Sequence, residues 1–242
     1  SRTGTFEVPL TGAGQSVTYT AYAVVDGKVY SGQTAGSSIT MSASTAYTVS
    51  GTVKDASGSK AGGVTVAYIS ADGKQFVFSA DGSGVYTAVL QSGTYTVYAY
   101  DMDGNAYLGR HTVSDDGTND IDMTGSRTIS TTLRYYTQIT SSGTKGIAFA
   151  DVQFTVVIDG ETYVFAKSTG TDGKVQVRVP AGYAVTAVLE KIDTAGFYCS
   201  KQTKEFSSGK SSDSVTWSLR ADPADDADMH VKTVTVSSDY VA

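Results

Sequence analysis

Cysteine, histidine and proline are scarce in this sequence of 242 residues, which contains one cysteine, two histidines and three prolines. The single Cys199 cannot form a disulfide within the chain, and no Cys/His spacing matches a zinc site. His111 and His230 lie far apart in the chain, and no Gly-x-Ser-x-Gly elbow is present for either to serve. These shortages argue against nucleophilic and zinc-dependent catalysis.

A phosphate-binding loop is missing as well. Gly12 and Gly14 form a Gly-x-Gly pair, but Val17 stands where a dinucleotide-binding loop needs its third glycine. We therefore expect a protein that is not an enzyme, with no catalytic residue and no cofactor.

Charge is also low, because charged residues make up only 17% of the chain and their balance gives a net charge of −6. Nucleic acid needs clustered cations, and so does an anionic membrane surface, so neither is an expected partner. The sequence contains no run of 18 or more apolar residues, so membrane insertion is not expected. The chain opens Ser-Arg-Thr without an apolar signal core, so we expect a mature chain or an excised fragment, with any anchor outside it or non-covalent.

Alternating strands are what the sequence has in abundance. Val152, Phe154 and Val156 fall on one face of an extended segment, while Gln153 and Thr155 fall on the other. Short segments of this kind recur between Gly, Asp and Ser turns, and no segment keeps a helical period. The pattern predicts an all-β protein built of antiparallel β-sandwiches.

An internal repeat organises these strands. Asp-Gly followed by a Val-rich strand, a glycine turn and a Tyr/Val-rich strand occurs around Gly82 and again around Gly173, and a related pattern starts at Gly4. The spacing of the three copies matches the size of a small β-sandwich domain.

The second copy carries motifs that can be compared with a known family. They are Gly-Thr-Val-x-Asp at 51–55, Gly-Val-Thr-Val at 63–66, Asp-Gly-x-Gly-x-Tyr at 81–86 and Gly-Thr-Tyr-Thr-Val at 93–97. Together they resemble the carboxypeptidase regulatory-like domain, a transthyretin-like, Ig-type sandwich. The resemblance implies tandem modules without catalytic residues, of the kind found in bacterial and archaeal surface proteins such as S-layer and sheath components.

The repeat predicts five segments. They are an incomplete half-sandwich at 1–45, complete sandwiches at 46–128 and 129–220, an acidic linker at 221–228 and a β-prone tail at 229–242. The period-2 faces predict a core that includes Val64, Val66, Val97, Val152, Phe154 and Trp217.

One acidic cluster has the spacing of part of a calcium loop. Asp101, Asp103 and Asn105 alternate in a tight turn, where carboxylates can converge on a hard cation. The distal bidentate Glu of a complete calcium loop is missing, and Asp-Gly after an alternating strand is a strong hairpin signal. We therefore favour a hairpin turn over a metal site.

Tyrosine is unusually common, with 16 Tyr against 8 Phe and one Trp. In the strand from 94 to 100, Tyr98 and Tyr100 lie on the face opposite Tyr95 and Val97, and Tyr22 is likewise placed opposite Tyr19. Because tyrosine is enriched at interfaces, we expect this second face to pack between modules or between chains. The alternative is that these rings cover sheet edges within one subunit.

The sequence favours a structural subunit of an extracellular, cell-wall or cell-surface assembly, such as a sheath, S-layer or filament, built by head-to-tail and lateral packing of sandwiches. Val231, Thr233, Val234 and Val236 in the tail would add as strands to the incomplete first module of the next subunit. The tail could instead return onto its own chain. A second hypothesis is a carbohydrate-binding or adhesive accessory module with a glycan as its partner.

Overall fold

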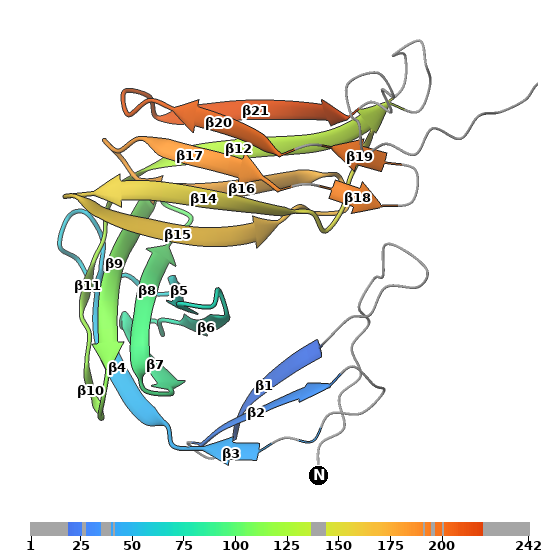
Figure 1. Cartoon of the computed structure of the whole chain (residues 1–242). Helices are drawn as coiled ribbons and strands as arrows, with labels where there is room; N and C mark the ends of the chain where they lie inside the picture. Colours follow the sequence, from blue (N-terminus) through green and yellow to red (C-terminus); the bar gives the residue numbers. More distant parts are fainter. Residues whose placement is uncertain are drawn as a thin grey trace, which may run out of the picture.

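The computed structural model describes residues 19–25, 28–34, 40, 42–136, 144–190, 192–194, 197–199 and 201–219. Every regular element in these ranges is a β-strand, as Figure 1 shows, and most neighbouring strands are antiparallel. The prediction of an all-β chain of antiparallel sheets is confirmed. Within the same ranges no helix is long and apolar enough to cross a membrane.

The first described strands form a small antiparallel sheet in the order β1-β2-β3. Its members are β1 (Tyr19–Val25), β2 (Lys28–Thr34) and β3 (Ser42–Ser44). This sheet lies beside the lower end of β4 in Figure 1 and belongs to the segment predicted as a half-sandwich. Residues 1–18, 26–27, 35–39 and 41 of that segment fall outside the described residues.

Two sheets form what we call the first sandwich. One sheet has β4 at its centre and consists of β4 (Tyr47–Lys54), β7 (Val85–Leu90), β10 (Gly117–Thr118) and β11 (Ile121–Asp122). The other has the order β9-β8-β5-β6 and consists of β5 (Thr65–Ser70), β6 (Gln75–Ser79), β8 (Gly93–Tyr100) and β9 (Asn105–Val113).

A second sandwich follows, with its strands running across the end of the first in Figure 1. One sheet is centred on β12 and consists of β12 (Thr124–Tyr136), β13 (Thr144–Gly146), β16 (Lys174–Pro180) and β21 (Ser212–Leu219). The other has the order β15-β14-β17-β20 and consists of β14 (Asp151–Ile158), β15 (Glu161–Ser168), β17 (Val185–Leu189) and β20 (Gln202–Phe206). A separate hairpin pairs β18 (Ile192–Thr194) with β19 (Phe197–Cys199).

The two sandwiches share one topology. β4 pairs antiparallel with β7 and parallel with β10 and β11, and β12 pairs in the same way with β16 and β21. In the facing sheets, β5 lies between β6 and β8 with β9 beyond, as β14 lies between β15 and β17 with β20 beyond. The internal repeat read from the sequence therefore corresponds to a repeated strand topology.

The structure shifts the alignment of the repeats by two positions. Gly84 and Gly173 occupy the same place, because each accepts a backbone hydrogen bond across the sheet, from Val53 at 2.8 Å and from Leu133 at 2.7 Å. Both have a left-handed backbone, with φ of 76° and 75°. The sequence paired Gly173 with Gly82 because each follows an aspartate. In the structure, the equivalent glycines are the ones directly before the strand, Gly84 before β7 and Gly173 before β16.

Both cores contain the residues predicted for them. Val64, Val66 and Val97 lie in the apolar cluster of the first sandwich, and Val152, Phe154 and Trp217 lie in that of the second. Five of these side chains are 0% exposed and Trp217 is 7% exposed, so this prediction is confirmed. Burying a side chain such as Val or Phe contributes about 1.5–3 kcal/mol each, which makes these clusters the main source of stability.

One strand belongs to both sandwiches. The first residues of β12, Thr124 and Gly125, pair with β9, and from Ser126 onward the strand pairs with β16. The predicted boundary between 46–128 and 129–220 therefore falls within a continuous strand. No flexible linker separates the two sandwiches at this point.

Candidate functional site at the sandwich junction

The face of β8 that points away from the first core meets the second sandwich. Tyr95, Val97 and Ala99 pack in the first core, whereas Tyr98 belongs to the cluster of the second. The Tyr98 ring stacks on Phe165 at a centroid distance of 4.7 Å and on Tyr100 at 5.1 Å. Tyr98 is 5% exposed, so it packs between two sandwiches of the same chain and is not available to another chain.

The Tyr98 hydroxyl covers the free edge of β16. It donates a hydrogen bond to the Arg178 carbonyl at 2.7 Å and accepts one from the Arg178 backbone N–H at 3.2 Å. β16 pairs with β12 along its other edge, where Arg178 lies opposite Thr128. Burial raises the pKa of the Tyr98 hydroxyl, which keeps it protonated and able to donate.

Two further carbonyls on this edge are also occupied by the chain itself. The Lys167 Nζ donates to the Gln176 carbonyl at 3.2 Å, and the Gly170 N–H donates to the Lys174 carbonyl at 2.8 Å. A strand edge whose carbonyls already have partners offers little to an added strand. Addition of another chain at this edge is therefore disfavoured.

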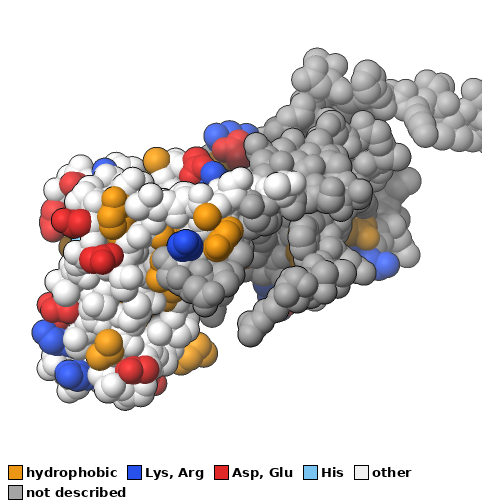
Figure 2. Space-filling view, turned by 90° about the horizontal axis from the view of Figure 1, so that it is seen from below, with side chains coloured by type: hydrophobic (Ala, Val, Ile, Leu, Met, Phe, Trp, Pro, Cys, Tyr) orange, Lys and Arg blue, Asp and Glu red, His pale blue; other side chains and the backbone are white. Residues whose placement is uncertain are grey.

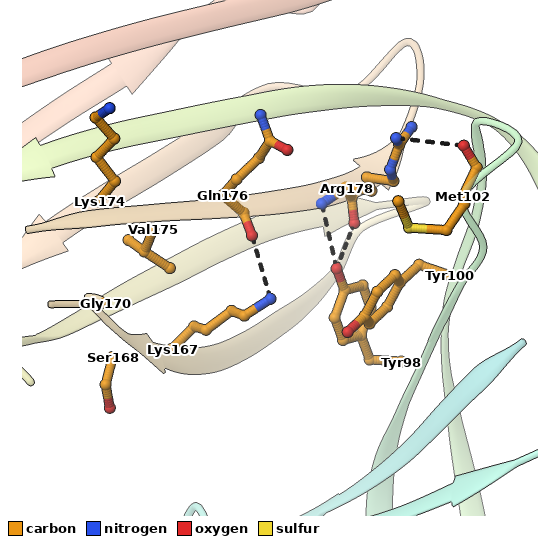
Figure 3. Close-up of a pocket in the computed structure, with 10 residues that line it drawn as sticks. All are labelled: Tyr98, Tyr100, Met102, Lys167, Ser168, Gly170, Lys174, Val175, Gln176 and Arg178. Atoms are coloured by element: carbon orange, nitrogen blue, oxygen red, sulfur yellow. Dashed lines mark hydrogen bonds between the residues drawn. The ribbon is translucent and has the colours of Figure 1, made fainter. Parts of the chain in front are cut away.

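A pocket of about 400 Å³ opens beside this edge, between the first sandwich and strands β15 and β16. Figure 3 shows its lining: the aromatic rings come from β8, Met102 comes from the turn after it, and the cationic and other polar side chains come from β15 and β16. The lining residues are Tyr98, Tyr100, Met102, Lys167, Ser168, Gly170, Lys174, Val175, Gln176 and Arg178.

Three cations line this pocket, and two of them have neutral partners. The Lys167 Nζ donates to the Gln176 carbonyl and lies 5.5 Å from the centre of the Tyr100 ring. The Arg178 guanidinium donates to the Met102 carbonyl at 3.4 Å. The ion pairs found within the described ranges include neither of these two residues. Lys174 alone pairs with a carboxylate, that of Asp172 at 3.6 Å. The pocket thus holds positive charge that no acidic side chain in the described part neutralises.

The residues considered for calcium form the turn between β8 and β9. One Asp101 carboxylate oxygen accepts a hydrogen bond from the Asn105 N–H at 2.8 Å, and the other accepts from the Asn105 side-chain amide at 2.6 Å. Asp103 is exposed at the tip of the turn. In the part of the chain that the structure describes, no three His, Cys, Asp or Glu side chains gather as a metal site would require.

The remaining predicted interface residues are divided between described and undescribed parts. Tyr22 lies in β1 opposite Ser31, and Tyr100 is half-buried at the pocket. The tail residues Val231, Thr233, Val234 and Val236 lie outside the described residues. The pocket cations were not identified from the sequence, because they sit on polar strand faces that resemble ordinary solvated positions. The only signal was the position of Tyr98 and Tyr100 opposite the first core.

Comparison with known proteins gives similarity in fold alone. No family model matches the chain, and a search of curated proteins finds no match. Among solved structures, the shaft pilin of Lactobacillus rhamnosus GG is 9% identical, with 73% of this chain and 99% of that chain covered and a TM-score of 0.33. The minor pilin of Streptococcus agalactiae is 14% identical, with 79% and 99% covered and a TM-score of 0.30.

The TIE protein of Bacillus anthracis is 12% identical, with 84% of this chain covered and a TM-score of 0.29. The chain spans only 41% of the length of that protein. Because the identities and TM-scores are this low, the fold class rests on the strands and sheets of the chain itself.

Proposed function

We propose that this chain is a structural, non-catalytic subunit of an extracellular assembly at the cell surface, such as a sheath, surface layer or filament. The observation that carries the proposal is the continuous join between the sandwiches. β12 takes part in sheets of both, and Tyr98 of the first sandwich is buried against Phe165 of the second. A regular assembly needs subunits whose parts keep a fixed orientation.

Polar contacts reinforce this junction on its outer side. The Gln75 side chain donates to the Ala166 carbonyl at 2.7 Å. Arg110 donates to the Thr162 carbonyl at 3.3 Å and lies 3.7 Å from the Glu161 carboxylate. The junction therefore combines an apolar interior with a hydrogen-bonded rim, which supports a stiff two-sandwich unit over two independently moving domains.

The exposed surface offers lateral contacts of modest size. Figure 2 shows acidic and basic side chains interspersed on one face, with hydrophobic side chains in separate patches. Among the described residues, the large apolar side chains with the highest exposure are Met102 at 83%, Val77 at 61% and Phe149 at 59%. Separate small patches of this kind suit repeated weak contacts between subunits, which together can hold an array.

For head-to-tail contact we propose strand addition by the tail 229–242. Among the described residues, β1 and β3 each pair with β2 alone, and the outer edges of this small sheet are where we propose that the strand adds. Val231, Thr233, Val234 and Val236 give the tail a strand-forming sequence. A contact of this type is heterologous and generates open filaments or rings.

Deletion of residues 229–242 tests this arrangement. Sedimentation velocity should show large species for the full chain and a monomer for the truncated chain, with an unchanged strand signal in circular dichroism. Val234→Asp in the full chain is a matched variant, because it places a charge in the added strand while keeping the tail length. Normal polymerisation of the truncated protein would show that the tail does not make the contact.

A further inference from the structure

The pocket at the sandwich junction concentrates positive charge in a chain whose net charge is −6. We propose that this pocket binds the oxyanion of an acidic saccharide, either the carboxylate of a uronic acid or the sulfate ester of a sulfated sugar. The proposal is independent of self-assembly, since it concerns residues that a single chain brings together.

The need for an anion follows from the partners of the cations. Lys167 and Arg178 donate to backbone carbonyls, which satisfy one hydrogen bond each and leave the positive charges unneutralised. An ammonium has three N–H donors and a guanidinium has five, so both residues have donors left for a ligand. A cleft lined by charges of one sign concentrates ions of the opposite sign, and charge-assisted hydrogen bonds to an oxyanion are stronger than those to neutral groups.

An extended acidic peptide is a poorer match for this pocket than a compact ligand. Peptides that bind at a strand edge use its free carbonyl and N–H groups. The carbonyls of Lys174, Gln176 and Arg178 on this edge already accept hydrogen bonds from the chain itself. What remains for a ligand is contact with the side chains that line the pocket.

The pocket also lacks the exposed aromatic face on which a neutral sugar would stack. Sugars without charge bind by stacking on an exposed aromatic face, but the Tyr100 ring is stacked on Tyr98 at 5.1 Å and has Lys167 near its face at 5.5 Å. The Tyr100 hydroxyl takes part in none of the hydrogen bonds found among the described residues, so it is available to a ligand. The ring thus supplies a polar group beside the cations and no stacking platform.

The size of the pocket favours a sugar over a bare ion. A volume of about 400 Å³ lies within the range of small-molecule sites and exceeds the volume of an inorganic oxyanion. Met102 adds an apolar side chain at the rim, which can cover the carbon face of a sugar ring. The cations would hold the oxyanion, and the rim would contact the ring that carries it.

The test measures binding to the full chain by two-dimensional NMR, with galacturonate, galactose 6-sulfate, neutral galactose, sodium acetate and sodium sulfate as probes. We expect one or both acidic sugars to shift the resonances around Lys167 and Arg178, and the three other probes to bind at least about fivefold more weakly. Whichever acidic sugar binds more tightly identifies the oxyanion, and either result supports the proposal.

Variants distinguish binding in the pocket from a general effect of the charge of the protein. Lys167→Gln and Arg178→Gln should each weaken binding by about tenfold, the effect of losing one charge-assisted hydrogen bond. Lys210→Gln removes the same charge on the turn before β21, where Lys210 pairs with Asp213, and should leave binding unchanged. Melting curves of the variants check that each one remains folded.

Four results would overturn the proposal. They are no binding of either acidic sugar, equal binding of neutral galactose, binding of acetate or sulfate as tight as that of the matching sugar, and equal loss in Lys210→Gln. The first two exclude an anion-dependent saccharide site. The third shows a site for simple ions, and the fourth shows an effect of net charge alone.

Discussion

The guanidinium of Arg127 forms an ion pair with the Asp213 carboxylate at 2.5 Å, and the Arg127 side chain is completely buried while that of Asp213 is 14% exposed. The same guanidinium donates to the carbonyls of Tyr183, at 3.0 Å, and Ser207, at 2.5 Å. Arg127 therefore joins β12 to β21 and to two connecting segments. It occupies the part of β12 that follows directly after the strand leaves the first sandwich.

Breaking this pair should strongly destabilise the protein. Arg127→Ala removes the buried partner of a largely buried carboxylate, which keeps only the exposed Lys210, and it takes the guanidinium away from two carbonyls. We therefore expect a loss of about 3–5 kcal/mol in the free energy of unfolding. Lys210→Ala is the matched control, because Lys210 pairs with the same Asp213 from an exposed position and should cost less than about 1 kcal/mol. Guanidinium chloride denaturation measures both. Equal stability of the two variants would show that burial of Arg127 does not matter.

Three polar groups in the first core form a closed ring of hydrogen bonds. The hydroxyls of Tyr68 and Tyr86 are 2.7 Å apart, Tyr86 donates to the Asn119 carbonyl at 2.7 Å, and the Asn119 amide donates to Tyr68 at 2.9 Å. Burial raises the pKa of both tyrosines. Each hydroxyl is hydrogen-bonded to both of the other residues, so removing one hydroxyl leaves two polar groups without that hydrogen bond.

This ring predicts a loss of stability at alkaline pH. A tyrosine whose pKa is raised by folding contributes stability that is complete below the unfolded pKa of about 10 and is lost as the pH rises above it. Tyr86→Phe should cost about 1–3 kcal/mol at neutral pH and reduce the dependence on pH above about 10. Tyr47→Phe, at the margin of the same core, is the control. Denaturation curves between pH 8 and 11 measure this, and an unchanged pH dependence in Tyr86→Phe would contradict it.

The corrected repeat alignment can be tested with two neighbouring glycines. A Cβ on Gly84 would lie 3.0 Å from the Val53 carbonyl, on a backbone with φ of 76°, whereas a Cβ on Gly82 would meet nothing within 4 Å. Gly84→Ala should therefore destabilise the first sandwich by at least about 1–2 kcal/mol. Gly82→Ala should stay within about 0.5 kcal/mol of the parent. Thermal denaturation compares them, and the reverse order would restore the alignment through Gly82.

Removal of calcium should have little effect on stability. The Asp101 carboxylate already accepts two hydrogen bonds from Asn105, so the turn between β8 and β9 is closed without a cation. Asp116 and Asp120 likewise accept backbone hydrogen bonds from Thr48 and Thr52, at 2.7 and 2.8 Å. We expect the melting temperature in EDTA to match that in calcium. A fall of more than about ten degrees, equivalent to a few kcal/mol, would indicate a structural cation.

Period-2 alternation was enough to predict the strands and both faces of β8, because side chains on successive residues of a strand must point to opposite sides. It placed Tyr95 and Val97 in one core and Tyr98 opposite them, where the second sandwich lies. Alternation says nothing about which strand pairs with which. The passage of β12 from β9 to β16 was therefore missed, although Gly125 stands directly before the residue at which the partner changes.

The pocket could not be predicted for a related reason. Its lining comes from β8, the turn after it, β15 and β16, which are brought together only when the second sandwich packs on the first. In the sequence, Lys167 and Arg178 occupy ordinary outward positions of alternating strands. Their shared surroundings are a property of the junction, and local patterns do not encode it.

The measurement that tests the central claim most directly is negative-stain electron microscopy of the purified full chain, concentrated at physiological ionic strength. If the protein is a structural subunit, the images should show filaments, sheets or rings with a constant repeat, in which the two sandwiches keep one fixed orientation. Monodisperse single particles at every concentration would contradict the structural role and favour a binding module that acts alone.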